Sequence, residues 1–579
     1  MGYDYALVHV KFTIPLAAAL SVAARPLISR LDVARVVFIS LVAVTATIPW
    51  DSYLIRTGVW TYPQDAVLGH TIYHIPVEEL FFFFIQTYIT ALLYILCNKP
   101  MLHAQYLTTP STRPSWISRR KLLGTVLLSS LTLMGGYFVA QNSDATYMGL
   151  ILAWACPFAL ITWTLTGDMI LAMPWTSTLA PIMIPTMYLW YVDELSLRSG
   201  TWSIEQGTKL GMTLFGSLEL EEAVFFLVTN TLIVFGLAAF DKAVAVCDVF
   251  PELFPEPSDK LPLGALLRAR VTPSSAYDMH RIAGLSEAVT RLQKKSRSFY
   301  LASSVFPGRL RIELTLLYSY CRLADDLVDN AASPAEALQW VSKLREYLNL
   351  RYNGSDAAVV RDFIRSNFEP SAWSALDLLP THILSSEPLY SLLAGFETDM
   401  EFKATKSWPI DDESDLELYA SRVASTIGEL CLDLVFHHTP PDASRDVLYA
   451  AAKEMGVALQ FVNIARDIAV DAQISRVYLP TTWLNEEGLS PEAVLLKPYG
   501  EPVERMRRRL LGKAFHMYRK SRRCMEWLPA EARGPMTVAV ESYMEIGRVL
   551  SEGKSRSEGK ATVPAWRRLG VVWRTLRSG

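Results

Sequence analysis

The sequence predicts an all-α protein in two unlike halves, a membrane bundle of seven helices followed by an all-helical domain outside the bilayer. Seven apolar runs fall within the first 240 residues, and each approaches the roughly 20 residues that a helix needs to cross a bilayer. The second half carries two acidic motifs whose aspartates stand four residues apart, as they would on one face of a helix. A chain of 579 residues is long enough for two or more domains.

The expected spans alternate with connections of different charge. Basic residues crowd the first connection, around Arg30, and the third, around Arg120, which places both connections and everything after Phe240 in the cytoplasm. We therefore expect a multi-pass membrane protein with residues 1–242 in the bilayer, a Pro-rich linker at 243–285, and a cytoplasmic domain at 286–579. The spans are expected at 4–24, 33–50, 74–97, 121–140, 146–166, 169–190 and 209–240.

Composition excludes some classes of function. A net charge of −3 leaves no excess of basic residues to neutralise phosphates, which argues against a nucleic-acid partner. The six cysteines have no C-x-x-C or zinc-like spacing and are expected to be free thiols. The first apolar stretch lacks a basic leader and a cleavage site, so no cleavable signal peptide is expected.

The membrane half contains an internal repeat. The segment Asp51–Trp60 matches Asp193–Trp202 at its Asp, Arg, Gly and Trp positions, and each copy is followed by a Glu-Glu pair that leads a Phe-rich helix. The repeats cover about 1–100 and 146–240 and share one orientation, a three-plus-one-plus-three layout whose motifs open toward the non-cytoplasmic face. Parallel repeats of this kind often build a site at their interface. The paired glutamates are Glu78, Glu79, Glu221 and Glu222.

Carboxylates in apolar helices are costly and indicate function. The duplicated glutamates favour a catalytic role, because an acid flanked by Phe and Trp can stay protonated and the rings can stabilise a carbocation. Which glutamate of each pair would act is open. For Asp51 and Asp193, two interpretations stand: a catalytic role, or a loop salt bridge to Arg56 and Arg198.

The acidic motifs of the second half predict a metal and diphosphate site. Two like-charged carboxylates one turn apart repel each other unless a cation lies between them, and Mg²⁺ takes carboxylate and phosphate oxygens. Asp326 lies off the shared helix face and fits a solvated surface position. The first motif holds Asp325 and Asp329 with Arg322, and the second holds Asn463, Asp467 and Asp471 with Arg466.

With these motifs in place, the first half resembles the membrane-bound lycopene cyclases of fungi, archaea and some bacteria, in which two homologous units form one cyclase. The resemblance implies that a glutamate protonates a terminal double bond of lycopene and that the ring then closes to a β-ionone end group. It assigns catalytic roles to Glu78, Glu79, Glu221 and Glu222, with Asp51 and Asp193 beside them. The chain has no G-x-G-x-x-G fingerprint, so neither FAD nor NAD(P)H is expected.

The second half, from about Ser286 onward, resembles the phytoene and squalene synthase family in the stretches 296–303, 318–329, 419–428, 456–471 and 476–480. The resemblance implies an all-helical isoprenoid synthase fold that joins two prenyl diphosphates head to head through a cyclopropyl intermediate. Tyr419 matches a tyrosine near the reacting carbons, and Ser421 departs from an aromatic common there. The implied ligands of Mg²⁺, or of Mn²⁺ as an alternative, are Asp325, Asp329, Asn463, Asp467 and Asp471, and the implied diphosphate-binding residues are Arg297, Arg322, Arg466 and Arg476.

Together the two resemblances predict a bifunctional enzyme of carotenoid biosynthesis. Its synthase half would convert two geranylgeranyl diphosphates to phytoene via prephytoene diphosphate, and its membrane half would cyclise lycopene to γ-carotene and β-carotene. The lipid bilayer and a separate phytoene desaturase would be its partners. The alternative is a squalene synthase-like domain fused to a transporter or a receptor-like module. A retinal protein is disfavoured because the last span, 211–240, has no lysine for a Schiff base.

Overall fold

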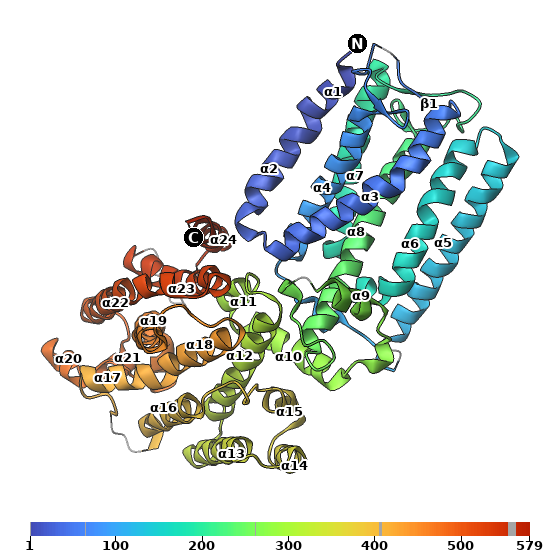
Figure 1. The fold of residues 1–579 in the computed structure, drawn as a ribbon. Coiled ribbons are helices and arrows are strands. Elements are labelled where there is room, and N and C mark those ends of the chain that lie inside the picture. The colour runs from blue at the N-terminus through green and yellow to red at the C-terminus, as the bar shows by residue number, and fades with distance from the viewer. Residues whose placement is uncertain are drawn as a thin grey trace. The chain divides into compact units, whose positions relative to one another are not determined.

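The computed structural model describes residues 2–63, 65–109, 111–260, 262–404, 408–553 and 563–578. The chain forms two compact units, residues 1–282 and 283–579, whose boundary falls inside helix α10 (Met279–Lys295). Helices dominate both units (Figure 1). The predicted all-α class is therefore confirmed.

The first unit holds the expected membrane helices. Its first span, Asp4–Leu27, combines α1 (Asp4–Val8), a π-helical turn (His9–Thr13), α2 (Ile14–Ala24) and a 3-10 turn (Arg25–Leu27). Among the described residues six helices are long and apolar enough to cross a bilayer, and α7, which contains Pro181 and Pro185, is not among them. The count of seven spans is therefore approximate. The other long helices are α3 (Arg30–Arg56), α4 (Val77–Asn98), α5 (Ser115–Gln141), α6 (Thr146–Ala172), α7 (Trp175–Ser199) and α8 (Leu220–Val249).

Two of the expected spans need corrected boundaries. The run 169–190 contains a helix break, because α6 ends at Ala172 and Met173 takes an extended conformation before Pro174. A residue that precedes proline is disfavoured in the helical region, which explains the break. The run 209–240 begins with non-helical chain that includes the hairpin of β5 (Thr213–Phe215) and β6 (Leu218–Glu219), so its helix starts only at Leu220.

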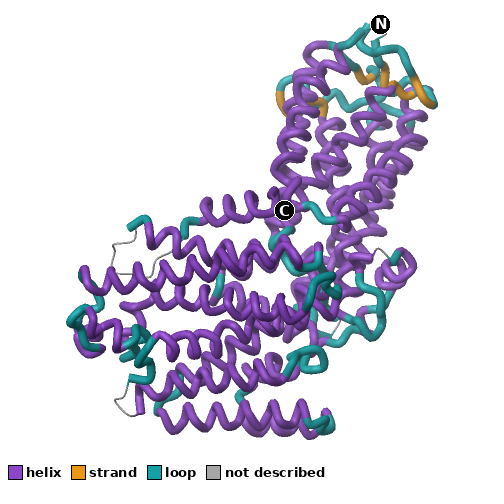
Figure 2. The backbone as a smooth tube through the Cα atoms, turned by 60° about the vertical axis from the view of Figure 1, so that its left-hand side comes forward, coloured by secondary structure: helices purple, strands orange, loops and turns teal. Residues whose placement is uncertain are grey.

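Short strands link the two repeats at one end of the first unit, where Figure 2 shows them together. β1 (Trp60–Thr61) pairs antiparallel with β4 (Ser203–Ile204), one strand from each repeat. A hairpin precedes each glutamate-bearing helix: β2 (Thr71–Ile72) with β3 (Ile75–Pro76) before α4, and β5 with β6 before α8. The glutamates of both repeats therefore lie near the same end of the bundle, with α4 packed against α3, α7 and α8.

The segment expected as a linker, 243–285, continues α8 to Val249 and includes α9 (Leu263–Val271), which packs on α8 within the first unit. A buried contact ties this stretch together, because the Ser258 hydroxyl donates a 2.9 Å hydrogen bond to Asp248.

In the second unit α19 is the central helix. It packs against α18, α22, α23 and the π-helical turn Ser421–Ser425, and its Phe461 is fully buried. The unit's helices are α10, α11 (Arg297–Ser303), α12 (Gly308–Asp329), α13 (Pro334–Tyr352), α14 (Ala357–Asn367), α15 (Pro370–Asp377), α16 (Ser386–Ala404), α17 (Glu413–Ala420), α18 (Thr426–His438), α19 (Arg445–Gln473), α20 (Thr481–Glu486), α21 (Pro491–Leu496), α22 (Glu501–Arg522), α23 (Ala530–Ser551) and α24 (Ala565–Ser578).

Candidate active sites

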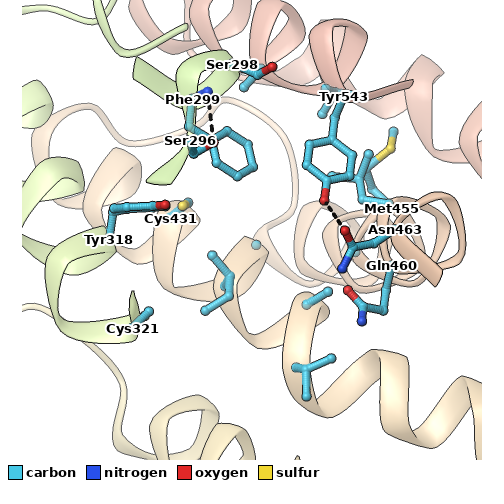
Figure 3. Close-up of a pocket in the computed structure, with 18 of the residues that line it drawn as sticks. Ser296, Ser298, Phe299, Tyr318, Cys321, Cys431, Met455, Gln460, Asn463 and Tyr543 are labelled. Atoms are coloured by element: carbon cyan, nitrogen blue, oxygen red, sulfur yellow. Dashed lines mark hydrogen bonds between the residues drawn. The ribbon is translucent and has the colours of Figure 1, made fainter. Parts of the chain in front are cut away.

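The second unit encloses a cavity of about 900 Å³. Figure 3 shows Tyr318 and Cys321 of α12 on one wall, and Gln460 and Asn463 of α19 on the facing wall. The Tyr543 hydroxyl reaches across to donate a 3.0 Å hydrogen bond to Asn463. All the implied metal-binding and diphosphate-binding residues line this one cavity: Arg297, Arg322, Asp325, Asp329, Asn463, Arg466, Asp467, Asp471 and Arg476, together with Tyr419.

The first acidic motif lies in the last two turns of α12. Arg322 forms a 2.8 Å ion pair with Asp325 and a second ion pair with Asp326. Asp326 also accepts a 3.0 Å hydrogen bond from Lys295 and does not line the cavity, which agrees with its expected surface role. Asp325 and Asp329 line the cavity from the same helix face.

The second motif lies on α19, and its arginine organises it. The Arg466 guanidinium donates a 2.8 Å hydrogen bond from Nε to Asp467 and another from Nη2 to Asn463. Asp471 lies one turn beyond Asp467 on the same helix and also lines the cavity. The motif thus presents three oxygen-bearing side chains to the cavity.

A fifth carboxylate, Asp399 of α16, joins the site although the sequence analysis did not single it out. It accepts a 2.7 Å hydrogen bond from the Tyr478 hydroxyl, and Arg476 lies 3.9 Å from it. The same Arg476 forms a 2.8 Å ion pair with Asp329, and Tyr419 stacks on Tyr478. Asp399 lies between Glu397 and Glu401 and has no acidic residue four positions away, so it lacks the paired spacing that reveals the other aspartates.

The electrostatics of the cavity favour an added cation. Burial, together with the nearby negative charge of Asp329, raises the pKa of Asp325 to about 7, although Arg322 opposes the shift. Burial also raises the pKa of Asp399, against the influence of Arg476 and Tyr478. Carboxyl groups that crowd together in this way hold protons unless a cation replaces them.

The donor set fits a hard divalent ion that is shared with substrate. Carboxylate and amide oxygens from α12 and α19 face one cavity, and arginines stand beside them, as suits Mg²⁺ bound by a few carboxylates plus phosphate. No group of three acidic, His or Cys side chains in the described part of the chain is close enough to form a complete metal centre. Asp325, Asp329, Asp467 and Asp471 would hold the metal with ligands completed by substrate.

The first unit contains a small cavity of about 20 Å³, near the end that carries the short strands. Residues from both repeats line it, so the repeat interface does build a common site. The lining residues are Tyr5, Val8, Thr13, Trp60, Glu79, Phe82, Leu189, Val192, Asp193, Trp202, Glu222, Phe225 and Phe226.

The two glutamates of each pair have different surroundings. Glu79 and Glu222 line the cavity, whereas Glu78 and Glu221 do not. Glu78 accepts a 2.7 Å hydrogen bond from the backbone N–H of Leu68, and Glu221 accepts one of the same length from Leu210. The first glutamate of each pair therefore holds the preceding loop, and the second faces the cavity.

Tyrosines, which the sequence analysis did not identify, hold the cavity glutamates. The hydroxyls of Tyr5 and Tyr62 both donate to Oε2 of Glu79, the second at 2.8 Å. The Tyr147 hydroxyl donates a 2.6 Å hydrogen bond to Glu222. These bonds fix the direction of both carboxyl groups inside the cavity.

The two aspartates of the repeat are buried within helices, not in loops. Asp51 is fully buried and Asp193 is 2% exposed, whereas Arg56 and Arg198 are exposed. Asp193 accepts a 3.1 Å hydrogen bond from the indole N–H of Trp202 and lines the cavity. The salt-bridge interpretation of these motifs therefore has no support in the structure.

Comparison with known proteins gives one answer for each unit. Residues 292–567 match the profile of the Squalene/phytoene synthase family, and residues 4–97 match that of the Lycopene cyclase family.

Relatives align with the whole chain. A protein of Colletotrichum graminicola named "Bifunctional lycopene cyclase/phytoene synthase" is 62% identical over 100% of both chains. A protein of the same name from Podospora anserina is 54% identical, again over 100% of both chains. Among solved structures, a dehydrosqualene synthase in complex with ligand covers 51% of this chain and 95% of its own, with 23% identity and a TM-score of 0.41.

Proposed function

Because the chain belongs to the family of bifunctional lycopene cyclase/phytoene synthases, we propose a specific division of the two reactions between its units. The second unit condenses two geranylgeranyl diphosphates to phytoene through prephytoene diphosphate. The first unit cyclises the end groups of lycopene to β-rings, which gives γ-carotene and then β-carotene. A separate desaturase must act between the two steps, because phytoene has fewer double bonds than lycopene.

One observation carries the synthase assignment: both aspartate motifs and four arginines line the same large cavity. Arg297, Arg322, Arg466 and Arg476 bind the diphosphate groups, for which the planar guanidinium is suited. Mg²⁺, when bound to the aspartates, supplies positive charge beside the leaving diphosphate. Apolar lining residues such as Phe299 and Leu459 keep water from the carbocation that forms as diphosphate leaves.

The cyclase assignment rests on Glu79 and Glu222, which face one aromatic cavity from the two repeats. An acid at this position adds a proton to the terminal double bond, and the cation closes the ring before it loses a proton. Trp60, Phe82 and Phe225 offer π-faces to the cation, which they stabilise by cation–π attraction. Since the cavity holds about 20 Å³, lining side chains must move to admit an end group.

Expression in a bacterium that makes geranylgeranyl diphosphate and carries a phytoene desaturase tests both reactions. Chromatography of the pigments should show cyclic carotenes only when this chain is present. Lycopene without cyclic products would contradict the cyclase proposal and support the synthase. Squalene in place of phytoene, in a strain without the desaturase, would contradict the assigned product of the synthase.

A further inference from the structure

The cyclase cavity is built from matched residues of the two repeats. Tyr5 precedes Asp51 by 46 positions, and Tyr147 precedes Asp193 by the same 46 positions. Each of these tyrosines donates to the cavity glutamate of its own repeat, Glu79 or Glu222. The two halves of the cavity therefore share one plan, and any difference between them has to come from individual residues.

The two repeats differ at one position beside Glu79. Tyr62 stands two residues after Trp60 and donates a second hydrogen bond to Glu79, whereas the matching position after Trp202 is Ile204. Ile204 has no group that could donate. Glu79 therefore accepts two hydroxyl hydrogen bonds on one oxygen, and Glu222 accepts one.

A second difference lies beside Glu222. Asp193 lines the cavity together with Glu222, and the Trp202 indole donates to it. In the other repeat Asp51 does not line the cavity, and neither of its carboxyl oxygens has a hydrogen-bond partner. Each cavity glutamate thus has a carboxyl group of its own repeat nearby, Asp193 in the cavity lining for Glu222 and Asp51 outside that lining for Glu79. Only Glu79 has a second hydroxyl donor.

Charge then decides what each glutamate can do. The described residues that line the cavity include three carboxyl groups and no Lys, Arg or His side chain. Isolated carboxylates are very costly in a medium of low polarity, so the cavity cannot hold three negative charges. A single negative charge is most stable where the most donors point at it, because hydrogen bonds to a charged group are the strong ones. That place is Glu79.

On this basis, and resting on the proposed cyclase function, we propose that the two cavity glutamates have separate tasks. Glu222 is the acid that donates a proton to lycopene, and Glu79, held as a carboxylate by Tyr5 and Tyr62, is the base that removes one. Tyr62 is then a positioning residue that makes the two repeats unequal.

The steps balance without any co-reactant. Glu222 gives its proton to C2 of the end group, which leaves a cation at C1. The electrons of the C5=C6 bond form the new C1–C6 bond, and the cation moves to C5. Glu79 removes the proton from C6, whose electrons restore the C5=C6 double bond of a β-ring. Transfer of that proton from Glu79 to Glu222 resets the site, so the reaction is an isomerisation.

This division has a consequence for the product. The cation at C5 can lose a proton from C6, from C4 or from its methyl group, and each loss gives a different ring. The base decides among these by its position, whereas the acid decides only whether a cation forms. Removing the base should therefore change the products, and removing the acid should prevent the reaction.

The test uses membranes that contain the full-length chain, supplied with unlabelled lycopene in D2O. With Glu222→Gln we expect neither cyclic carotenes nor deuterium in the recovered lycopene. With Glu79→Gln we expect β-ring formation to fall by about a hundredfold, the usual worth of a general base, while deuterium still enters recovered lycopene or rings of another type. Tyr62→Phe should shift the ring type in the same direction to a smaller degree.

Matched variants separate this idea from a fold defect. Tyr147→Phe should slow cyclisation and leave the β-ring as the product, because it perturbs only the acid. Tyr88→Phe removes a hydroxyl of α4 that meets Ser21 outside the cavity, and it should leave both rate and product unchanged. Phytoene synthesis by the same membranes, with equal amounts of protein, controls for the integrity of the chain.

Deuterium in lycopene with Glu222→Gln would overturn the assignment, as would β-ring formation at the wild-type rate with Glu79→Gln. The assignment would also be overturned if no deuterium entered lycopene or any ring product with either variant, since both glutamates would then be needed for protonation. Failure of the wild-type chain to form any ring would instead refute the proposed cyclase function.

Discussion

At the scale of single residues, one position along a helix separates the two glutamates of each pair, and that step changes their surroundings. Neighbouring residues in a helix point about 100° apart. Glu79 therefore faces the cavity, whereas Glu78 turns to the backbone of Leu68. The sequence could identify the pair of glutamates but not which of the two faces the cavity. That depends on where the loop before the helix folds back and offers its backbone N–H group.

The first prediction concerns the loop-holding glutamates. Glu78→Gln and Glu221→Gln should retain most of the cyclase activity, because a glutamine oxygen can still accept the hydrogen bond from the loop. The conversion of lycopene to β-carotene measures this. Complete loss of cyclisation in these variants, with normal activity of Glu79→Gln and Glu222→Gln, would assign the chemistry to the other glutamate of each pair.

The second prediction compares neighbouring aspartates of α12. Asp325→Asn should lower phytoene synthesis by about a hundredfold or more, because a carboxylate that would hold the metal ion beside the diphosphate is lost. Asp326→Asn is the matched control, since Asp326 lies outside the cavity and pairs with Lys295 and Arg322. Radiolabelled geranylgeranyl diphosphate measures both. Equal loss in the two variants would indicate damage to the helix and not to the site.

The third prediction concerns pH. With a pKa of about 7, Asp325 is protonated in acid solution and ionised above neutrality, and only the ionised form binds a metal ion. The Mg²⁺ concentration that gives half-maximal phytoene synthesis should therefore rise as pH falls below 7, by up to about tenfold per pH unit for one proton released. Titrations at pH 6 and pH 8 test this. An unchanged Mg²⁺ requirement would show that Asp325 does not exchange a proton for the metal.

Residues that act together were predictable only where they share a spacing. The aspartates of α12 and α19 follow helical spacing, and the glutamates follow the repeat. Asp399 follows neither, and it reaches the cavity only through the packing of α16. Tyr5 and Tyr147 were missed, although their equal distance of 46 residues from Asp51 and Asp193 shows that the repeat could have been extended to them.

At the scale of elements, helix positions followed from hydropathy, but helix ends followed from local conformation. The break between α6 and α7 lies inside one apolar run, and its cause is Pro174, which a sum of hydropathy does not register. The hairpin of β5 and β6 also lies inside a predicted span, 209–240, because hydropathy does not distinguish it from the helix that follows. Both differences move the ends of helices without moving the glutamates that the helices carry.

The fourth prediction tests how closely α19 packs. A Cβ atom at Gly456 would lie 2.4 Å from the Cα atom of Ser425, in the backbone of the adjacent π-helical turn. Gly456→Ala should therefore destabilise the synthase unit by about 1–3 kcal/mol, the usual cost of overpacking. Gly512→Ala is the control, because nothing lies within 4 Å of a Cβ atom there and alanine favours a helix. On heating, the Gly456→Ala variant should lose synthase activity at a lower temperature than the Gly512→Ala variant. Equal heat resistance would show that the backbone of the π-helical turn can shift to make room for the added Cβ atom.

At the scale of the whole molecule, each glutamate-bearing helix has acidic residues at its start and basic contacts at its other end. Glu222 lies in the first turn of α8, whereas Asp241 near its end pairs with Arg35 at 2.9 Å. At about 1.5 Å per residue, these two positions are roughly 28 Å apart, close to the thickness of the hydrocarbon layer. We therefore expect the cyclase cavity and the basic end to lie toward opposite faces of the membrane.

The fifth prediction is the resulting topology. Positive residues favour the cytoplasmic face, so the basic end, with Arg35, Lys99, Arg113 and Lys121, should lie there, and the synthase unit that follows α8 should lie on the same side. The loop between α7 and α8 should lie on the other side. In sealed vesicles with the cytoplasmic face outward, added protease should remove an epitope tag placed after Gly579. A tag inserted after Gly207 should be cut only once detergent opens the vesicles. Digestion of the Gly207 tag in intact vesicles, with protection of the tag after Gly579, would reverse the orientation, since the cyclase cavity and the synthase unit would still lie at opposite ends of α8.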